Sequence, residues 1–513
     1  MKKLLSILCA AALALSLAAC GAESQSGGGE AKAAVYSLES ATTFTFSDSG
    51  ITAQDGSYTG YEIDGTTLTI DGAGAYVVTG ACADGSIQIK KGTTGVTLAL
   101  NGLALTSADT APILCGKSTE VVIVAADGST NSLTDAAENN DDSYPDNTEA
   151  ENAVIKCKDG AQVTLCGGGA LTINANGKNG IKSGASTTEE GEASLTIREL
   201  TLTINAPVND AINAQQLLNV ESGTLTISAA DDAIHSDLVL NIGGDGTDGP
   251  TIAITECCEG LEAAELNVLS GNIDILSSDD CLNAANSDLS GYAFSMNISG
   301  GVITACSSSG DGFDSNGDLT ISGGTVTVWT ANAADNQPLD ADGAITVSGG
   351  TVLAAGGSAG MGMNLTAEQP CVTFGSTGGM GGGRPGDMDG GNASIAKDAA
   401  VTITGSDGSA VYSGTALCNA NFVFFSSPEL TADGSYTLTA GDTSLTATAQ
   451  TGNISSGGMG GMGGPGNGGQ RPGDRDGGQP PELPDGQQAP DFSGGGQPPE
   501  KPSGQQPDTT QNS

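Results

Sequence analysis

Acidic side chains recur at fixed distances from an apolar residue along the middle of the chain. Each occurrence is a short unit with one apolar anchor, a polar residue two positions before it and another one position after it. The anchors are Ile181, Ile212, Ile234, Leu261, Leu282, Phe313 and Leu339. The residues two positions before them are Asn179, Asp210, Asp232, Glu259, Asp280, Asp311 and Gln337. The residues one position after them are Lys182, Asn213, His235, Glu262, Asn283, Asp314 and Asp340.

If these units stack, carboxylates lie one strand spacing apart, ~4.8 Å. Neighbouring carboxylates at that distance repel by roughly 3 kcal/mol per pair at an effective dielectric constant near 20. The sequence has no Lys or Arg from residue 199 to residue 383. We therefore expect a metal ion to neutralise the carboxylates. Ca²⁺ is the natural candidate, because it takes six to eight hard oxygen ligands in flexible geometry.

The candidate calcium ligands come from these units and from the acidic turns beside them. Two stretches sharpen the case, Asp311-Gly-Phe-Asp314-Ser-Asn316-Gly-Asp318 and Asp340-Ala-Asp342-Gly343. For any single aspartate, a turn in which the carboxylate binds its own backbone is the alternative. The candidate ligands are Asp231, Asp232, Asp237, Glu259, Glu262, Asp279, Asp280, Asp311, Asp314, Asn316, Asp318, Asp340 and Asp342.

The elements that position these residues are predicted to be short β-strands. Strand-like Gly-x-Leu-Thr-Ile units or close variants occur at 169–173, 223–227, 318–321 and 324–328. Consecutive anchors are between 21 residues (Leu261 to Leu282) and 31 residues (Ile181 to Ile212) apart. A β-sandwich does not return the same tetrapeptide, whereas a solenoid reuses its turns in every coil. The sequence therefore predicts an all-β parallel solenoid in which the anchors form one inward-facing file.

Composition restricts the function. The chain has 60 acidic and 16 basic side chains, a net charge of -44, which excludes nucleic-acid binding through a basic groove. An anionic polymer would need a bridging cation. With 79 glycines and one tryptophan among 513 residues, small repeated cores are expected instead of one core of large side chains. The 12 cysteines lack metal-site spacing and are interpreted as buried apolar residues or occasional disulfides.

The two ends of the chain have their own signals. Lys2 and Lys3 precede an apolar run at 4–17 that closes on Cys20, typical of a lipoprotein signal. We therefore expect a lipidated Cys20 and a monomer on the outer face of a bacterial cell membrane, held there only by its lipid. The expected segments are a signal peptide at 1–19, a spacer at 20–34, a β-helix at 35–360, a Gly/Met-rich loop at 361–391, a small β module at 392–452 and a disordered Gly/Pro/Gln-rich tail at 453–513.

Several of these units resemble the carbohydrate-binding parallel β-helix family of clostridial surface proteins. The resemblance rests on Gly-Thr-Leu-Thr-Ile, Asp231-Asp-Ala-Ile-His-Ser-Asp237, Glu259-Gly-Leu-Glu262 and the stretch from Asp311 to Asp318. It implies a right-handed β-helix that carries Ca²⁺ and binds acidic plant-wall polysaccharide such as polygalacturonate, with cellulose as a second ligand. Cys258 departs from the pattern where Asp231 stands, and Asn179 and Gln337 replace the acid at the ends.

Parallel β-helices also include enzymes, so the fold leaves catalysis open. A lyase needs a base, and Lys182 and Arg198 are expected to face solvent, while His235 is expected to be a ladder member. A hydrolase needs only two carboxylates. We expect a polysaccharide binder first, a lyase or glycoside hydrolase second, and a structural stalk or adhesin third. Trp329 is expected on an outward face, where it is a candidate for stacking on a sugar.

Overall fold

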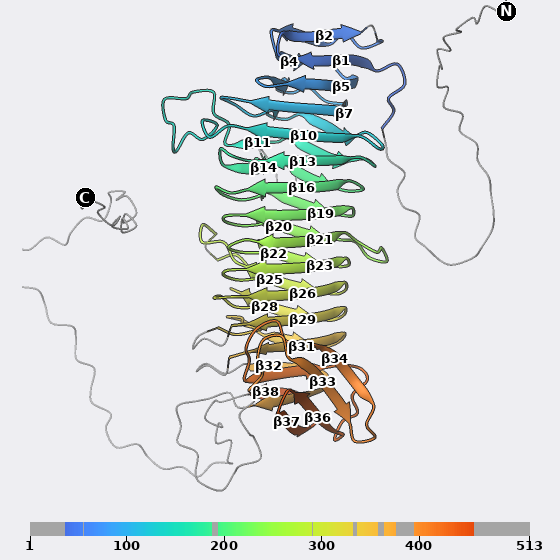
Figure 1. Ribbon diagram of the computed structural model, residues 1–513, viewed down its shortest axis with the longest axis vertical. Helices are drawn as coiled ribbons and strands as arrows, with labels where there is room; N and C mark the ends of the chain where they lie inside the picture. The colour runs from blue at the N-terminus through green and yellow to red at the C-terminus, as the bar shows by residue number, and fades with distance from the viewer. Residues whose placement is uncertain are drawn as a thin grey trace, which may run out of the picture. The chain divides into compact units, whose positions relative to one another are not determined.

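The computed structural model describes residues 36–54, 56–186, 193–289, 291–331, 336–357, 364–375 and 394–455. The chain divides into two compact units, Met1–Met459 and Gly460–Ser513, and all described residues lie in the first. In these ranges the structure is all β, with one large mixed sheet and one four-stranded sheet. Figure 1 shows successive coils of strands stacked on one another from β5 to β31. The expected signal peptide, Cys20 and the expected spacer lie outside the described residues.

Three columns of strands run through the stack, and the first contains the predicted anchors. Its strands pair in parallel from each coil to the next. They are β4 (Thr67–Ile70), β6 (Ser86–Ile89), β8 (Ile113–Cys115), β11 (Ala153–Cys157), β14 (Asn179–Ser183), β17 (Ile212–Ala214), the first parts of β20 (Ile234–Ile242) and β22 (Leu261–Val268), β24 (Leu282–Ala284) and β27 (Phe313–Ser315).

The second column follows in each coil and is also parallel. It begins with the first parts of β5 (Gly74–Cys82) and β7 (Val96–Ser107). It continues through β9 (Glu120–Ala125), β12 (Gln162–Cys166), β15 (Ser194–Ile197), β18 (Leu217–Val220), the later parts of β20 and β22, β25 (Ser295–Ile298), β28 (Asp318–Ile321), β30 (Ile345–Val347) and β32 (Asn364–Gly375).

The third column completes each coil with further parallel pairs. It contains the later parts of β5 and β7, β10 (Thr130–Asp135), β13 (Ala170–Asn174), β16 (Thr201–Ala206), β19 (Thr224–Ala229), β21 (Thr251–Glu256), β23 (Asn272–Ser277), β26 (Val302–Ser307), β29 (Thr325–Thr330) and β31 (Thr351–Gly356). The Gly-x-Leu-Thr-Ile units do not all occupy the same column. The unit at 318–321 lies in β28 of the second column, and the others lie in the third.

The predicted file of anchors is confirmed. Ile181 pairs in register with Ile212, and the register continues through Ile234, Leu261, Leu282 and Phe313. A parallel bridge joins Phe313 to Leu339. All seven anchors are fully buried and belong to one continuous apolar core. The file also extends toward the N-terminus through Leu68, Ile87, Ile113 and Ile155, which the sequence analysis did not identify.

An outward-facing asparagine ladder supports the second column. Asn241 donates a side-chain hydrogen bond to Asn219 (2.9 Å), Asn267 donates one to Asn241 (3.0 Å), and Asn297 donates one to Asn267 (3.1 Å). The amides of Asn241 and Asn267 each donate and accept along the stack, as identical amides do in in-register sheets. These hydrogen bonds therefore help to fix the register of the coils, together with the packing of the buried anchors.

Antiparallel strands lie at both ends of the described stack. Near the N-terminus, β1 (Thr42–Ser47) pairs with β2 (Gly50–Gln54), and β3 (Tyr61–Asp64) pairs with β4. Near the C-terminus, β35 (Phe422–Ser426) runs antiparallel to both β31 and β32, and β38 (Gln450–Ser455) runs antiparallel to β32. The four-stranded sheet consists of β33 (Ala400–Gly405), β34 (Ala410–Thr415), β36 (Ser435–Ala440) and β37 (Thr443–Thr448).

Two expected boundaries differ from the structure. The loop expected at 361–391 contains β32 over Asn364–Gly375, because the second column uses one more strand than the fading repeat suggested. The module expected at 392–452 contributes β35 and β38 to the large sheet in addition to its own four-stranded sheet. β38 also extends this module to residue 455, into the tail expected from residue 453. The rest of the expected loop, 361–363 and 376–391, and the tail beyond residue 455 lie outside the described residues.

Replacing one anchor tests the importance of the file. Leu282→Ala removes a fully buried side chain from the core and should lower the free energy of unfolding by about 2 to 5 kcal/mol. Leu276→Ala is the matched control, because Leu276 is 55% exposed on β23 and the change there should stay within about 0.5 kcal/mol. Urea unfolding followed by circular dichroism measures both. Equal effects at the two sites would contradict the inward-facing file.

Candidate functional site

Two ladders of polar residues border the anchor file. The turn ladder is formed by the residues two positions before the anchors, from Asn179 to Gln337, and the outer ladder by those one position after, from Lys182 to Asp340. Register places Asn213 beside Lys182, His235 beside Asn213 and Glu262 beside His235. Asn283 and Asp314 follow in the same register. The predicted alignment of the outer ladder from Lys182 to Asp314 is therefore confirmed.

Backbone hydrogen bonds hold the turn ladder at a fixed spacing. The amide that follows each turn-ladder residue donates to the carbonyl of the next one, as Gly260 N–H does to Asp280 (3.0 Å) and Gly312 N–H to Gln337 (2.8 Å). The close approach explains the glycine before three of the anchors, Gly180, Gly260 and Gly312: a Cβ on Gly260 would lie 2.3 Å from the carbonyl oxygen of Cys281.

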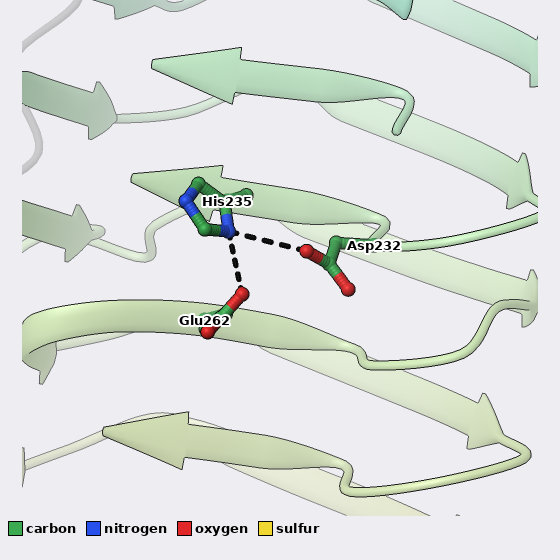
Figure 2. A group of neighbouring side chains, drawn as sticks. All are labelled: Asp232, His235 and Glu262. Carbon is green, nitrogen blue, oxygen red and sulfur yellow. Dashed lines mark hydrogen bonds and ion pairs between the residues drawn. The ribbon is translucent and has the colours of Figure 1, made fainter. Parts of the chain in front are cut away.

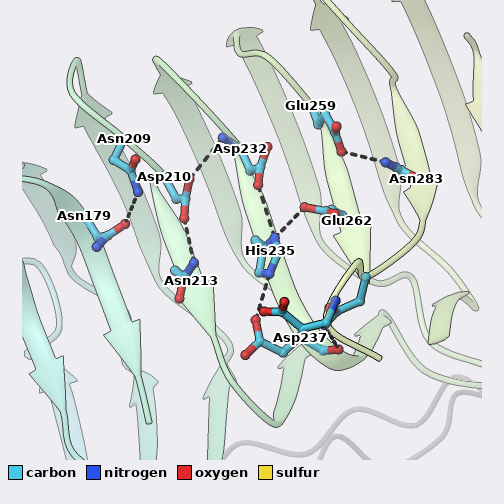
Figure 3. A network of polar contacts seen from close by, with 12 residues as sticks. Asn179, Asn209, Asp210, Asn213, Asp232, His235, Asp237, Glu259, Glu262 and Asn283 are labelled. Carbon is cyan, nitrogen blue, oxygen red and sulfur yellow. Dashed lines mark hydrogen bonds and ion pairs between the residues drawn. The ribbon is translucent and has the colours of Figure 1, made fainter. Parts of the chain in front are cut away.

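His235 contacts three carboxylates: Figure 2 shows Asp232 and Glu262, and Figure 3 adds Asp237. Its Nδ1 lies 3.1 Å from Asp232 Oδ2 and 2.5 Å from Glu262 Oε2, and its Nε2 lies 3.0 Å from Asp237 Oδ1. Burial opposes the positive charge, but the hydrogen bonds to Asp232, Asp237 and Glu262 overcome it and raise the pKa of His235 to about 12. A protonated His235 therefore compensates part of the charge of this group, a contribution that the absence of Lys and Arg from this stretch did not reveal.

Asp210 continues the network toward the N-terminus (Figure 3). Its carboxylate accepts a hydrogen bond from the Asn213 amide (2.6 Å) and one from Asp232 N–H (3.3 Å). Burial and the charge of Asp232 raise the pKa of Asp210 to about 6. Ligand atoms of Asp210, Asp231 and Asp232 lie within 4.8 Å of one another, and so do those of Asp232, His235 and Glu262. Asp210 belongs to the predicted row of polar residues two positions before the anchors, but it is not among the predicted calcium ligands.

Glu259 and Asn283 lie on the next coils. Asn283 donates its amide to Glu259 Oε2 at 2.9 Å, as Figure 3 shows. Burial, followed by the charge of Glu262, raises the pKa of Glu259 to about 8. The Oδ1 atom of Asn283 is buried, in a residue that is 8% exposed, and has no hydrogen-bond partner in the part of the chain that the structure describes. A buried amide oxygen without a donor is unfavourable unless a cation or another donor satisfies it.

A second carboxylate group lies on the C-terminal coils and has no cationic partner among the described residues. Ligand atoms of Asp311, Asp314 and Asp340 lie within 4.8 Å of one another. Asp280 accepts Asp311 N–H (2.7 Å), and Asp311 accepts Gln337 N–H (2.5 Å). Burial and neighbouring aspartates raise the pKa of Asp280 to about 6 and that of Asp311 to about 7. Burial is also the main cause of the raised pKa values of Asp314 and Asp340.

The remaining predicted ligands do not join these groups in the described structure. Asp318 accepts a hydrogen bond from Ala344 N–H at 2.8 Å, 26 residues later in the chain, so its carboxylate bonds to the backbone of the following coil and not to its own turn. Asp279, Asn316 and Asp342 are exposed next to the ladders but belong to none of the three groups. The structure thus concentrates the candidate metal chemistry on a subset of the predicted residues.

Trp329 does not provide a sugar platform. It is fully buried, because the outward face of β29 is covered by the C-terminal segment, and Trp329 shares an apolar cluster with Phe425 on β35 and with Leu353 on the neighbouring β31. The alternation of β29 was correctly interpreted as pointing away from the first core, but that face meets a second core instead of solvent. The expectation of an exposed Trp329 is therefore wrong.

The basic residues near the ladder differ from the expectation in detail. Lys182 is half-buried and pairs in register with Lys156 on β11, a residue that the sequence analysis did not consider. Burial and the charge of Lys182 lower the pKa of Lys156. The Arg198 side chain is 18% exposed and lies 3.7 Å from Glu221. Both expected solvent-facing residues are therefore partly covered.

Comparisons with known proteins identify the family. Residues 64–360 match the family described as "Carbohydrate-binding domain-containing protein". A protein of the same description from Acetivibrio thermocellus is 35% identical over 123 residues, which are 24% of this chain and 42% of that protein. The chain thus spans less than half of this relative's length. Within the described residues, no helix is long and apolar enough to cross a bilayer.

A solved structure has a weaker likeness to the chain. It is titled "Structure of the polysaccharide lyase-like protein from C. thermocellum, Gadolinium derivative" and aligns with 60% of this chain and 96% of its own, at 22% identity. Its TM-score is 0.38, so this likeness assigns no property to the chain. The family match bears out the carbohydrate-binding part of the resemblance noted in the sequence. Because that match extends over more than half of the 513 residues, this chain belongs to the carbohydrate-binding domain-containing protein family.

Proposed function

We propose that the chain binds an acidic polysaccharide, such as polygalacturonate, through Ca²⁺ ions held by the two ladders of a right-handed parallel β-helix. The observation that carries the proposal is the group of Asp311, Asp314 and Asp340, whose ligand atoms lie within 4.8 Å of one another without a described cationic partner. Burial makes three ionised carboxylates in this position unfavourable, and bound Ca²⁺ would reverse that balance.

The residues present fit calcium in number and kind. Ca²⁺ takes oxygen ligands from carboxylates, amides and backbone carbonyls. Asp311, Asp314 and Asp340 would supply the first oxygens, with Asp280 next to them on the turn ladder. Asn283 Oδ1, which has no hydrogen-bond partner among the described residues, adds an acceptor on the outer ladder, between Glu262 and Asp314 in register. The His235 group fits less well, because a protonated imidazole already occupies its carboxylates.

Bound calcium explains how so acidic a chain could hold an acidic polymer. With a net charge of -44, direct attraction of a polyuronate is unfavourable. A Ca²⁺ ion with ligand positions open toward solvent would accept a uronate carboxylate and link it to the ladder. In-register coils would repeat this contact along the polymer. A lipid on Cys20 would hold the protein at the outer face of the cell membrane, so that it captures polysaccharide there.

Binding without cleavage is favoured over catalysis by the recurrence of the carboxylates. A glycoside hydrolase needs one acid and one nucleophile or base in distinct environments. Here raised pKa values recur from Asp210 through Asp311 with the same main cause, burial. His235, bonded on both ring nitrogens, is held in its charged form. Cleavage of a pectin-like polymer stays as the alternative, and the binding experiment below distinguishes it.

Removal of calcium should lower stability, and one substitution should change the melting temperature in opposite directions with calcium and with chelator. Free Ca²⁺ at about 100 times its dissociation constant should raise the free energy of unfolding by ~2.7 kcal/mol. Asp311→Asn should lower the melting temperature in calcium because it removes a charged ligand, yet raise it in chelator because it removes a buried charge. Asp274→Asn, at an exposed carboxylate on β23, is the matched control and should change neither. Differential scanning calorimetry measures all three proteins, and identical melting in calcium and chelator would contradict the metal sites.

Polysaccharide binding should depend on calcium. Polygalacturonate immobilised on a sensor surface should retain the protein in Ca²⁺ and release it in chelator, and Asp311→Asn should weaken retention at least about tenfold, the equivalent of ~1.4 kcal/mol. Asp274→Asn should bind like the parent. Unsaturated uronate in the supernatant would establish a lyase, and new reducing ends would establish a hydrolase. Binding that persists in chelator would point to neutral glycan contacts and overturn the calcium bridge.

Stability without metal should fall as pH rises. The pKa values of Asp210 and Asp280 are about 6 in the folded chain, and those of Asp311 and Glu259 are about 7 and 8. All exceed the value near 4 of an unfolded carboxyl, so the folded state binds more protons from about pH 4 to pH 8 and loses stability across that range. Urea unfolding in chelator should give a higher free energy at pH 5 than at pH 8, by more than ~1.4 kcal/mol. Asp311→Asn should flatten this profile and Asp274→Asn should not. A rise toward pH 8 would contradict buried, uncompensated carboxylates.

A further inference from the structure

Two cysteines from distant parts of the chain meet at the C-terminal end of the described stack. Cys306 lies on β26 and Cys418 lies between β34 and β35, 112 residues later. Their sulfur atoms are 2.7 Å apart. The Cys418 thiol also lies 3.6 Å from the carbonyl oxygen of Ser307. This contact joins the third column directly to the C-terminal segment.

The surrounding packing holds the two thiols together. Cys306 pairs in register with Leu276 on one side and with Trp329 on the other. It therefore lies on the face of the third column that packs against the second core, which both cysteines border. On the C-terminal side, Asn421 N–H donates to the carbonyl of Gly356 at 3.0 Å, three residues after Cys418. The thiols are thus fixed from both sides.

We propose that Cys306 and Cys418 are a thiol pair that closes to a disulfide on exposure to a small disulfide oxidant. The Cys418 thiolate attacks the oxidant's disulfide, forms a mixed disulfide and releases one thiol. Cys306 then attacks the Cys418 sulfur, and the second half of the oxidant leaves as a thiol. The two cysteines lose two electrons and two protons, and the oxidant takes up both, so that its one disulfide becomes two thiols.

The environment assigns different roles to the two thiols. A hydrogen bond from Cys306 lowers the pKa of Cys418, burial opposes this effect, and the charge of Lys397 adds to it. The same hydrogen bond, with burial, raises the pKa of Cys306. Attack requires the thiolate and access to the oxidant. The lowered pKa of Cys418 favours its thiolate, and its partial burial leaves the sulfur accessible to an oxidant.

A second thiol pair in the same chain provides an internal control. Cys115 and Cys157 are register partners on β8 and β11 and share a side-chain hydrogen bond. Both are fully buried inside the first core. A dissolved oxidant cannot reach them without unfolding of the coils. Proximity alone would oxidise both pairs, whereas proximity with access oxidises only Cys306 and Cys418.

The consequence of closure is a covalent link between β26 and the segment that covers Trp329. The link would close a loop of more than 100 residues, and long loops lose much of their unfolded-state freedom when closed. The oxidised protein should keep its C-terminal segment docked under conditions that release it from the reduced protein. This inference is independent of calcium and of the proposed polysaccharide.

The test treats the full chain, first reduced, with oxidised glutathione, then alkylates the remaining thiols under denaturing conditions. Digestion uses a protease that cleaves at Asp and Glu, because no Lys or Arg lies from residue 199 to residue 383. Mass spectrometry should find Cys306 and Cys418 in one cross-linked peptide pair, and Cys115 and Cys157 alkylated. Oxidation should also raise the melting temperature of the parent, and Cys306→Ser should abolish that shift while Cys115→Ser retains it.

Three outcomes would overturn the proposal, and none requires a variant to fold. The first is complete alkylation of Cys306 and Cys418 after oxidant treatment of the parent chain. The second is glutathione retained on Cys418 without transfer to Cys306. The third is a link between Cys115 and Cys157 at the same rate, which would show that oxidation follows unfolding. A cross-link confined to Cys306 and Cys418 supports it.

Discussion

In-register parallel stacking of buried apolar anchors is the constraint on which the rest of the structure depends. Leu261 lies over Leu282 and Leu282 over Phe313, each fully buried, so every coil must repeat the position of the coil before it. Side chains next to an anchor inherit that alignment whatever their charge. The polar ladders are therefore a product of the core, because a register that suits leucine also aligns aspartate with aspartate.

The chain compensates the aligned charge differently along its length. Around Asp232 and Glu262 the compensating charge is internal, from His235. Around Asp311 and Asp340 the described residues supply backbone N–H donors but no positive side chain. Backbone donors stabilise a carboxylate only partly against burial, as the raised pKa of Asp311 indicates. The carboxylates around Asp311 and Asp340 therefore need a cation from solvent more than those around Asp232 and Glu262 do.

The sequence predicted the features that depend on local repetition. The anchor file and the outer ladder followed from one tetrapeptide, because stacking leaves little freedom once the turn recurs. The exposure expected for Trp329 is wrong, and the charge that His235 contributes to its ladder was not predicted, since both environments come from residues distant in sequence. Trp329 is covered by a segment almost 100 residues later, and His235 is compensated partly from the following coil. The ladder of Asn219, Asn241 and Asn267 was not predicted, because one asparagine per coil forms a recognisable pattern only once the pairing of the strands is known.

The reversed strands at the ends of the stack bear on how the protein behaves at high concentration. A parallel stack offers each terminal coil as a template on which another chain could add strands, and open edges of this kind promote fibre growth. At the C-terminal end β35 runs against both β31 and β32, and at the N-terminal end β2 runs against β1. A strand in the opposite direction does not present the next coil's register. We therefore expect the reversed strands to disfavour end-to-end addition of a second copy, which would otherwise find nearly interchangeable coils to pair with.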